Sequence, residues 1–337
     1  MKILVTGDSG YVGSFLCQDL LKQDYKIVGL DLDFFLENDL IATKRKYKRI
    51  NKDIRNITES DLSNIDCIIH LAGISNDPLG ELNEDLTYKI NFHGTINLVD
   101  KAKKAGVKKF LYASTQSVYG ISKKIDEEIK ENTKNILPIT AYAKSKYKAE
   151  IEILKKASNK FHVIIFRPAT VFGPSINFRS DIVLNNLTAS AFLFNKLIIQ
   201  SDGTPWRPIL HIKDMCKFFI SGINRSDELN KEIINLGYPG YNYQIKELAE
   251  KIKKVMPKAS IVIENKKIDN RTYKVNFDKA YKFFKNDINF NLNIELNISN
   301  LVDFFKEIKF DKEMFESRKT VRIKQMKYLI KSKKIFE

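Results

Sequence analysis

The stretch that decides the fold is KILVTGDSGYVGSF, residues 2–15. It opens with a short apolar run typical of a buried strand, and the apolar spacing after the loop is typical of a helix that reaches Lys22. Between them stand Gly7, Gly10 and Gly13. One glycine makes the tight turn, a second lets a pyrophosphate approach the backbone, and a third lets the helix pack on the strand. Because free N–H groups at a helix start attract phosphate, the stretch predicts a dinucleotide site.

Asp31 indicates which dinucleotide is bound. It ends the next expected strand, Lys26–Asp31, 18 residues after Gly13. A carboxylate at this position accepts both ribose hydroxyls of NAD and repels the additional phosphate of NADP, and no Arg follows it directly. We therefore expect NAD as the cofactor.

Composition limits the remaining possibilities. The chain has 337 residues, 43% hydrophobic and 29% charged, which is typical of a globular protein of about two domains. No apolar run approaches the roughly 18 residues of a membrane span, and we expect no signal peptide in the first residues. The three cysteines form no CxxC pair and the four histidines no HExxH motif. We expect no disulfide framework, no catalytic metal and a reducing cytoplasm.

The net charge of +16 raises the question of a nucleic-acid or lipid partner. The excess is spread along a Lys-rich chain, and no motif interleaves basic and aromatic residues, so we expect no nucleic-acid partner. Residues 311–337 carry nine Lys or Arg against four Asp or Glu. The pattern over Asp311–Lys334 predicts an amphipathic helix in a basic tail. We expect it to pack on its own protein or on a partner subunit, with binding to a membrane surface as the alternative.

Strands and helices alternate through the first half of the chain. Further strands are expected at Asp66–Leu71, Lys109–Ser114 and His162–Arg167, and long helices at Asp85–Lys104 and Thr140–Lys156. This rhythm predicts an α/β fold of the Rossmann type, a doubly wound parallel sheet with helices on both faces.

After Pro174 the elements become shorter and predict a smaller α+β lobe. We expect an NAD-binding domain over residues 1–175 that reclaims parts of 205–236. A substrate-binding lobe over 176–310 and the basic tail follow.

Tyr142 and Lys146 place a phenol and an ammonium group on one helical face, one turn apart. An ammonium near a phenol favours the phenolate and lowers the pKa of the phenol. Such a tyrosine removes a hydroxyl proton while hydride leaves the same carbon. Other Tyr–Lys pairs in the chain share this spacing, but Tyr142 opens a helix between two central strands, with Thr140 as the expected N-cap.

The GxxGxxG spacing of the first loop resembles that of the extended short-chain dehydrogenase/reductase family, whose best-known members are NAD-dependent enzymes acting on nucleotide sugars. Further residues match in family order along nearly the whole chain. The resemblance implies a cofactor site made by the loop residues Gly7, Gly10, Tyr11, Val12 and Gly13, by Asp31, by Asp53 and Ile54 at the adenine, by Leu71, Ala72 and Gly73, and by Asn91, Tyr142 and Lys146.

The resemblance also assigns the catalytic residues. Thr115, four residues before the tyrosine of a Val-Tyr-Gly turn, matches the family position that holds the reacting hydroxyl beside Tyr142. Lys146 matches the lysine that fixes the nicotinamide ribose. The 4,6-dehydratases of this family carry Asp-Glu directly after the threonine, whereas this chain has Gln116 and Ser117. An amide and a hydroxyl cannot act as acid and base at neutral pH, which disfavours dehydration.

The second half of the chain resembles the family's substrate lobe. The resemblance implies that Asn186, Arg207 and Arg271 bind the diphosphate of a nucleotide sugar, and Arg179 lies in the intervening loop, within expected reach of the substrate. Arginines from separate loops suit a pyrophosphate, because each guanidinium group can donate two parallel hydrogen bonds to phosphate oxygens. The segment Trp206-Arg207-Pro208 departs from the pattern of galactose 4-epimerases.

We therefore expect an NAD-dependent nucleotide-sugar epimerase that transiently oxidises a sugar carbon, C4 by preference. Net 4-dehydrogenation or ketosugar reduction uses the same residues and stays open. The alternative from another functional class is a non-catalytic Rossmann-fold binding protein. The joint presence of Thr115, Tyr142 and Lys146 argues against this alternative. By analogy with the family, we expect a homodimer.

Overall fold

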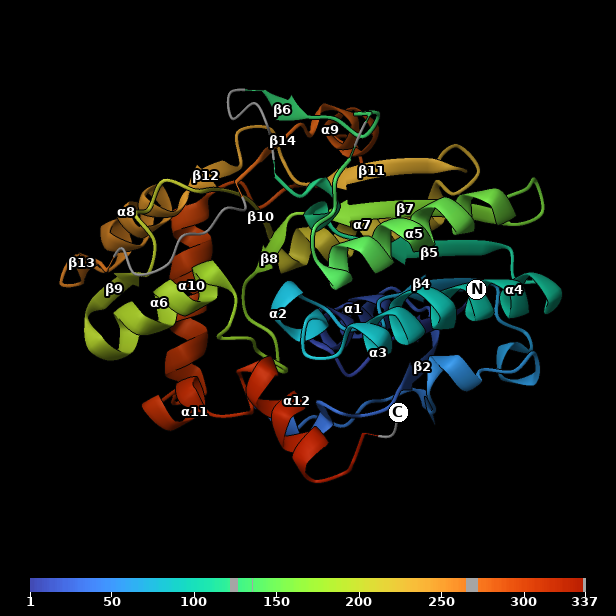
Figure 1. The fold of residues 1–337 in the computed structure, drawn as a ribbon, viewed down its shortest axis with the longest axis horizontal. Helices are drawn as coiled ribbons and strands as arrows, with labels where there is room; N and C mark the ends of the chain where they lie inside the picture. The colour runs from blue at the N-terminus through green and yellow to red at the C-terminus, as the bar shows by residue number, and fades with distance from the viewer. Residues whose placement is uncertain (122–126, 135, 265–271, 336–337) are drawn as a thin grey trace.

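The centre of the computed structural model is a sheet of seven parallel strands in the order β11-β7-β5-β4-β1-β2-β3 (Figure 1). The structure describes residues 1–121, 127–134, 136–264 and 272–335. The strands are β1 (Lys2–Thr6), β2 (Lys26–Asp31), β3 (Lys48–Asn51), β4 (Cys67–His70), β5 (Lys109–Ala113), β7 (His162–Pro168) and β11 (Glu232–Leu236). The chain winds in opposite directions on the two sides of the β1–β4 pair, which opens a crevice at the carboxyl ends of the strands. The predicted Rossmann-type α/β fold is confirmed.

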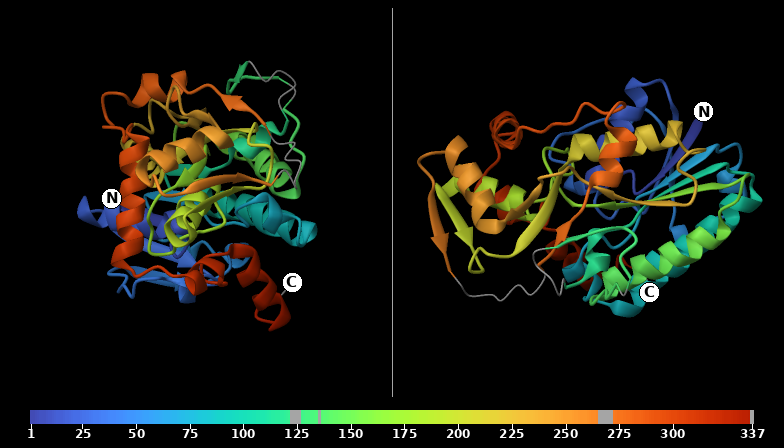
Figure 2. Two further views of the ribbon diagram at one scale, coloured as in Figure 1. Left: turned by 90° about the vertical axis from the view of Figure 1, so that its left-hand side faces the viewer. Right: turned by 90° about the horizontal axis from the view of Figure 1, so that it is seen from above.

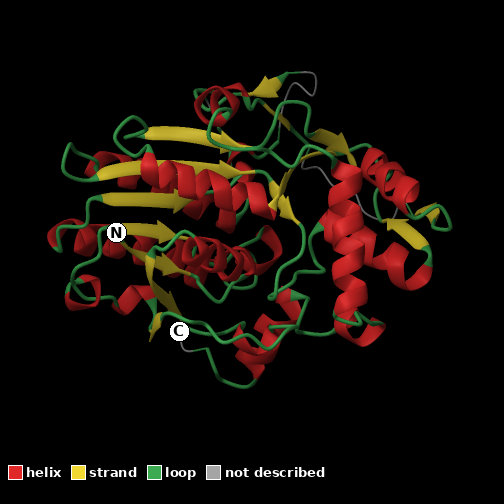
Figure 3. Ribbon diagram, turned by 180° about the vertical axis from the view of Figure 1, so that it is seen from behind, coloured by secondary structure: helices red, strands yellow, loops and turns green. Residues whose placement is uncertain are grey.

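Helices cover both faces of the sheet, as the layers in Figure 3 show. β1 supplies side chains to both layers. Ile3 and Val5 pack in one core with Leu16, whereas Leu4 packs in the other with Leu98. Because successive strand residues point to opposite faces, a strand covered on both sides must be apolar throughout. The helices are α1 (Tyr11–Lys22), α7 (Ile212–Asn224) and α9 (Asp278–Phe284) on the first face, and α3 (Glu84–Tyr88), α4 (Thr95–Lys104) and α5 (Ala141–Lys156) on the second.

The predicted long helix over Asp85–Lys104 is present in the structure, but its middle is a wider, π-helical turn. A turn of π-helix over Lys89–Gly94 separates α3 from α4. Within this turn, the side chain of Asn91 accepts a hydrogen bond from the Ile74 N–H at 2.8 Å and donates to the Ile74 carbonyl at 3.0 Å. The wider turn therefore brings Asn91 onto the loop after β4, and π-turns of this kind are frequent at functional sites.

A smaller α+β lobe lies beyond the carboxyl ends of the sheet, toward which the arrowheads of the strands point in Figure 3. The right-hand view of Figure 2 shows this lobe beside the sheet. Its helices pack around a separate core that includes Leu184, Leu248 and Ile298. The elements of this half are β8 (Thr170–Phe172), α6 (Val183–Phe194), β9 (Lys196–Ile199), β10 (Trp206–His211), β12 (Asn242–Gln244), α8 (Ile245–Val255), β13 (Ser260–Ile263) and α10 (Ile294–Glu307), with the short pair β6 (Glu128–Ile129) and β14 (Lys274–Val275).

The C-terminal segment returns to the sheet and forms two helices, α11 (Lys312–Glu316) and α12 (Arg322–Lys331), where the sequence predicts one. The chain turns between them because Thr320 is held from two sides. Its hydroxyl donates to the Met314 carbonyl at 2.6 Å, and its carbonyl accepts from the Ser180 N–H at 3.0 Å. α12 then packs against α2 (Asp77–Gly80), as Figure 1 shows. Within the described ranges, no helix has the length and apolar character needed to cross a bilayer.

Candidate functional site

A cleft of about 1010 Å³ lies between the carboxyl edge of the sheet and the smaller lobe. It gathers residues that are far apart in sequence, such as Asp31 at the end of β2 and Thr115 after β5. Of the predicted site residues, Asn91 does not line the cleft, and Arg271 falls outside the described residues. The predicted site residues that line the cleft are Gly7, Gly10, Tyr11, Val12, Gly13, Asp31, Asp53, Ile54, Leu71, Ala72, Gly73, Thr115, Tyr142, Lys146, Arg179, Asn186 and Arg207.

The glycine loop forms a cradle that no other residue type fits. Gly7 has φ +77°, and a Cβ atom on Gly13 would lie 2.0 Å from the Gly7 carbonyl oxygen. α1 begins directly after Gly10 and has no side-chain cap on its first turn. Its first N–H groups are therefore left for a ligand, and the helix dipole favours an anion there. The residues present thus fit the pyrophosphate of a dinucleotide.

Asp31 lies beside this cradle. Its carboxylate accepts hydrogen bonds from the N–H groups of Ser9 at 3.1 Å and Asp33 at 2.9 Å. Burial, with a smaller contribution from the charge of Asp8, raises the pKa of Asp31 to about 6. A ribose diol donating to this carboxylate would favour its charged form.

Sequence reasoning missed an ion-pair network behind the glycine loop. The fully buried carboxylate of Asp8 accepts from Arg49 Nε at 2.7 Å and from the Tyr47 hydroxyl at 2.9 Å. Arg49 Nη1 also donates to Asp33 at 3.1 Å. Asp8 could have predicted this network from the sequence, because a carboxylate inside a phosphate-binding loop needs a cation to neutralise it. Since Arg49 is bound by two carboxylates, it is not free to receive a ribose 2′-phosphate.

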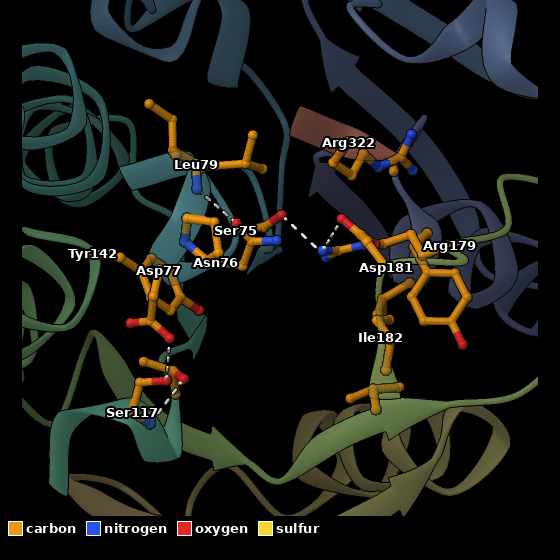
Figure 4. A pocket seen from close by; sticks show the side chains of 18 of the residues that line it. Ser75, Asn76, Asp77, Leu79, Ser117, Tyr142, Arg179, Asp181, Ile182 and Arg322 are labelled. Atoms are coloured by element: carbon orange, nitrogen blue, oxygen red, sulfur yellow. Dashed lines mark hydrogen bonds and ion pairs between the residues drawn. The ribbon is translucent and has the colours of Figure 1, made fainter. Parts of the chain in front are cut away.

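The first turn of α5 positions Tyr142 at the cleft. The hydroxyl of Thr140 caps the helix by accepting from the Ala143 N–H at 3.1 Å, as the sequence predicts. Tyr142 is 8% exposed and lines the cleft together with Thr115. Burial raises the pKa of Tyr142 above its usual range, and the smaller opposing effects of Thr115 and of the charge of Arg179 do not offset it. In Figure 4, Tyr142 and Asp77 form one wall of the cleft, and Arg179 lies on the wall facing them.

Lys146 follows Tyr142 by one turn and is 4% exposed. Its ammonium group donates to the Ala113 carbonyl at 2.8 Å and lies 4.7 Å from the centre of the Tyr112 ring. Burial lowers the pKa of Lys146 to about 7. That Lys146 lowers the pKa of Tyr142 stays a prediction from the sequence.

The two residues after Thr115, Gln116 and Ser117, have hydrogen-bond partners that the sequence does not predict. The Gln116 amide donates to the carbonyls of Arg167 at 3.0 Å and Leu236 at 3.3 Å, so it serves the fold. The Ser117 hydroxyl donates to the carboxylate of Asp77 at 3.5 Å. Asp77 in turn accepts from the Thr140 hydroxyl at 2.6 Å, which ties this wall to the cap of α5.

This geometry agrees with a comparison of the whole chain against known protein families. The model of the NAD dependent epimerase/dehydratase family matches residues 3–237, from the first strand through β11. The chain belongs to this family. It is therefore an enzyme of the extended short-chain dehydrogenase/reductase group, and NAD is its cofactor.

Relatives within the epimerase/dehydratase family differ in the reaction that they catalyse. The chain is 30% identical over 290 residues to UDP-glucuronic acid decarboxylase 6 of Arabidopsis thaliana, covering 83% of this chain and 82% of the relative. It is 27% identical to UDP-glucuronate 4-epimerase of Thermodesulfobacterium geofontis, covering 95% and 99%. The crystal structure of UDP-glucuronic acid 4-epimerase from Bacillus cereus, in complex with UDP-glucuronic acid and NAD, superposes with a TM-score of 0.77 at 26% identity, covering 91% and 100%.

The far end of the cleft carries the predicted diphosphate-binding residues of this family member. Asn186 lines it from α6 and donates to the Ser180 carbonyl at 2.9 Å. Arg207 lines it from β10, where Nη1 donates to the Trp206 carbonyl at 2.8 Å. Arg179 is held by Asp181 at 2.8 Å. In the described part of the chain, no three His, Cys, Asp or Glu side chains gather as a metal site.

Proposed function

We propose that this enzyme is a nucleotide-sugar epimerase that oxidises its substrate transiently at C4. One observation carries the proposal: the side chains of Thr115 and Tyr142 both line the cleft that begins at the glycine cradle, where Thr115 acts on the Tyr142 phenol. Elimination of water needs a further acid and base beside this pair. The positions that supply them in dehydratases hold Gln116 and Ser117, and Asp77 already accepts from Thr140.

The chemistry follows from the roles of three side chains. Thr115 holds the sugar hydroxyl, Tyr142 is the general base that removes its proton, and Lys146 binds the nicotinamide ribose. NAD, when bound, would supply the acceptor for the hydride that leaves the same carbon and the source of its return. If the ketone turns over in the cleft, hydride reaches its other face and Tyr142 returns the proton, which gives the epimer with no net change in the cofactor. The diphosphate binds at Asn186 and Arg207, with Arg271 as the third predicted residue.

A panel of nucleotide sugars tests the reaction type. The protein is incubated with NAD and with UDP-glucuronic acid, UDP-glucose or dTDP-glucose, while reduced cofactor is followed by absorbance and the sugar by NMR. We expect inversion at C4 without accumulation of reduced cofactor. Accumulation would support net dehydrogenation, because the ketone then leaves the site. A pentose product or a 4-keto-6-deoxy sugar would contradict the proposal in favour of decarboxylation or dehydration.

Replacement of Tyr142 by Phe tests the proposed base. Removing a positioned general base costs about 10²–10⁴-fold in rate. We therefore expect Y142F to lose at least 100-fold in kcat while it binds NAD with unchanged affinity. Tyr147, on the same helix, is the matched control, and we expect Y147F to retain activity. Turnover of Y142F within tenfold of the unmodified enzyme would show that another group takes the proton.

We also propose that the enzyme is a homodimer that works in the cytoplasm. The family resemblance supports a pairing of the helices beside α5. The three cysteines, Cys17, Cys67 and Cys216, are all free thiols buried in the fold, which suits a reducing compartment.

A further inference from the structure

The C-terminal segment brings a side chain into the cleft that no motif predicts. Arg322, the first residue of α12, lines the cleft opposite Tyr142 (Figure 4). The helix is held there by Met326 and Leu329, which share an apolar cluster with Leu79. The guanidinium of Arg322 lies 4.1 Å from the centre of the Phe35 ring. It is therefore fixed by packing on residues from both ends of the chain.

The hydrogen bonding of Arg322 is incomplete. Its Nη2 donates to the side chain and to the carbonyl of Asn177. Its Nη1 is buried and has no partner within the described residues, although Arg322 is only 2% exposed. A buried donor without a partner costs free energy, and a buried charge without a counter-ion costs more. The side chain is thus built for a group that occupies the cleft.

The charges around Arg322 indicate an anionic group. Arg179 lies close by, and its side chain is paired with Asp181 at 2.8 Å. The charges of Arg179 and Arg322 both act on this carboxylate and help to hold the pKa of Asp181 below its usual range. Asp39, another nearby carboxylate, is bound by Arg45 at 2.8 Å. Burial and the charge of Arg179 lower the pKa of Arg322 to about 9, which still leaves it charged at neutral pH.

We propose that Arg322 is a cofactor-binding residue whose guanidinium donates to the pyrophosphate of bound NAD, so that the C-terminal segment forms one wall of the cofactor site. Phe35 follows the strand that ends in Asp31, and Asn177 follows Gly173, whose carbonyl accepts from the Tyr11 hydroxyl at 2.7 Å. These contacts belong to the cofactor half of the cleft. The nucleotide sugar also carries a pyrophosphate, so the test must separate the two ligands.

Calorimetric titration separates the cofactor from the nucleotide sugar. The full chain is first freed of bound nucleotide and is then titrated with NAD or with UDP. A charge-assisted hydrogen bond to phosphate is among the strong ones. We expect R322Q to weaken NAD binding at least tenfold and to leave UDP binding unchanged. Lys327 is an exposed cation on the same helix, and we expect K327Q to change neither. R322K keeps the charge and should recover part of the affinity.

Thermal unfolding distinguishes ligand binding from a structural role. Because R322Q removes a buried charge, we expect its Tm without NAD to be unchanged or higher, and the rise in Tm on adding NAD to be smaller. A lower Tm without NAD and an undiminished rise would make Arg322 a structural residue. If R322Q binds UDP more weakly and NAD normally, Arg322 binds the substrate and the proposal is wrong. Unchanged binding of both NAD and UDP would also overturn the proposal.

Hydrogen exchange of the unmodified chain covers the case in which R322Q does not fold. We expect added NAD to slow exchange of the amides in α12, because the cofactor then bridges the helix to the glycine loop. Unchanged exchange in α12, with slowed exchange at the glycine loop, would contradict the proposal.

Discussion

Asp31 ends β2 beside the glycine cradle, and its titration makes a prediction about NAD. Burial and the neighbouring charge of Asp8 raise the pKa of Asp31 to about 6. A ribose diol needs the carboxylate as acceptor, so protonation removes the interaction. We expect the affinity for NAD to be constant above pH 7 and to fall below pH 6, by up to about tenfold per pH unit. Calorimetric titrations between pH 5 and pH 8 measure this slope.

The variant D31N is the control for this pH dependence. It keeps the shape of the side chain and cannot ionise, so its affinity should be lower at pH 7 and flat between pH 5 and pH 7. If D31N keeps the inflection near pH 6, another group titrates with NAD binding and the assignment of Asp31 is wrong.

The residues that sequence reasoning found differ in one physical respect from those it missed. The glycine loop, Asp31 and the Tyr142–Lys146 pair depend on spacings within one loop, strand or helix, which the local backbone fixes. Arg49 and Arg322 depend on partners that are 41 and 145 residues away in the sequence. No local pattern distinguishes them from the other cations of a Lys-rich chain, so only the fold reveals them.

At the scale of elements, the N-cap of α5 links stability to the position of Tyr142. Thr140 accepts from the Ala143 N–H and donates to Asp77 at 2.6 Å. Loss of an N-cap costs about 1 kcal/mol, and it frays the turn that carries Tyr142. We expect T140A to lower the free energy of unfolding by about that amount, measured with urea, and to lower kcat several-fold. T140S keeps the hydroxyl and should behave like the unmodified enzyme.

Asn293 offers a matched cap away from the cleft. It opens α10, where its side chain accepts from the Leu296 N–H at 2.9 Å. We expect N293A to lose a similar free energy of unfolding with unchanged kcat. An equal loss of kcat in both variants would show that general destabilisation, and not the position of Tyr142, reduces the activity.

The positions of helices and strands were predictable where burial requires one face or both faces of the helix or strand to be apolar. β1 and β2 have the predicted bounds because the apolar side chains in the middle of each strand enter the two cores on opposite faces of the sheet. The π-turn inside the predicted helix Asp85–Lys104 was not predictable, because it depends on the contact of Asn91 with Ile74 in the loop after β4. The break in the tail likewise depends on the hydrogen bond between Thr320 and Ser180, which periodicity does not contain.

At the scale of the whole molecule, the alternation of strands and helices predicts the sheet, whereas the return of the last segment to the first crevice follows from tertiary contacts alone. The net charge of +16 also acts at this scale. The outward ridge of α5 consists of Lys144, Lys148, Ile151 and Lys155, all exposed. If the proposed homodimer pairs across this helix, it brings like charges from two copies together around the apolar side chain of Ile151.

This ridge predicts how dimerisation responds to salt. Repulsion between exposed charges is screened as the Debye length falls from about 30 Å at 0.01 M to about 10 Å at 0.1 M salt. We therefore expect light scattering to show more dimer at higher salt. Ile151 is 40% exposed, and I151K adds a charge at the contact, so it should give a monomer at every salt concentration. Ile263, 53% exposed on β13, is the control, and I263K should remain dimeric. If I151K dimerises normally, the subunits pair through a different face.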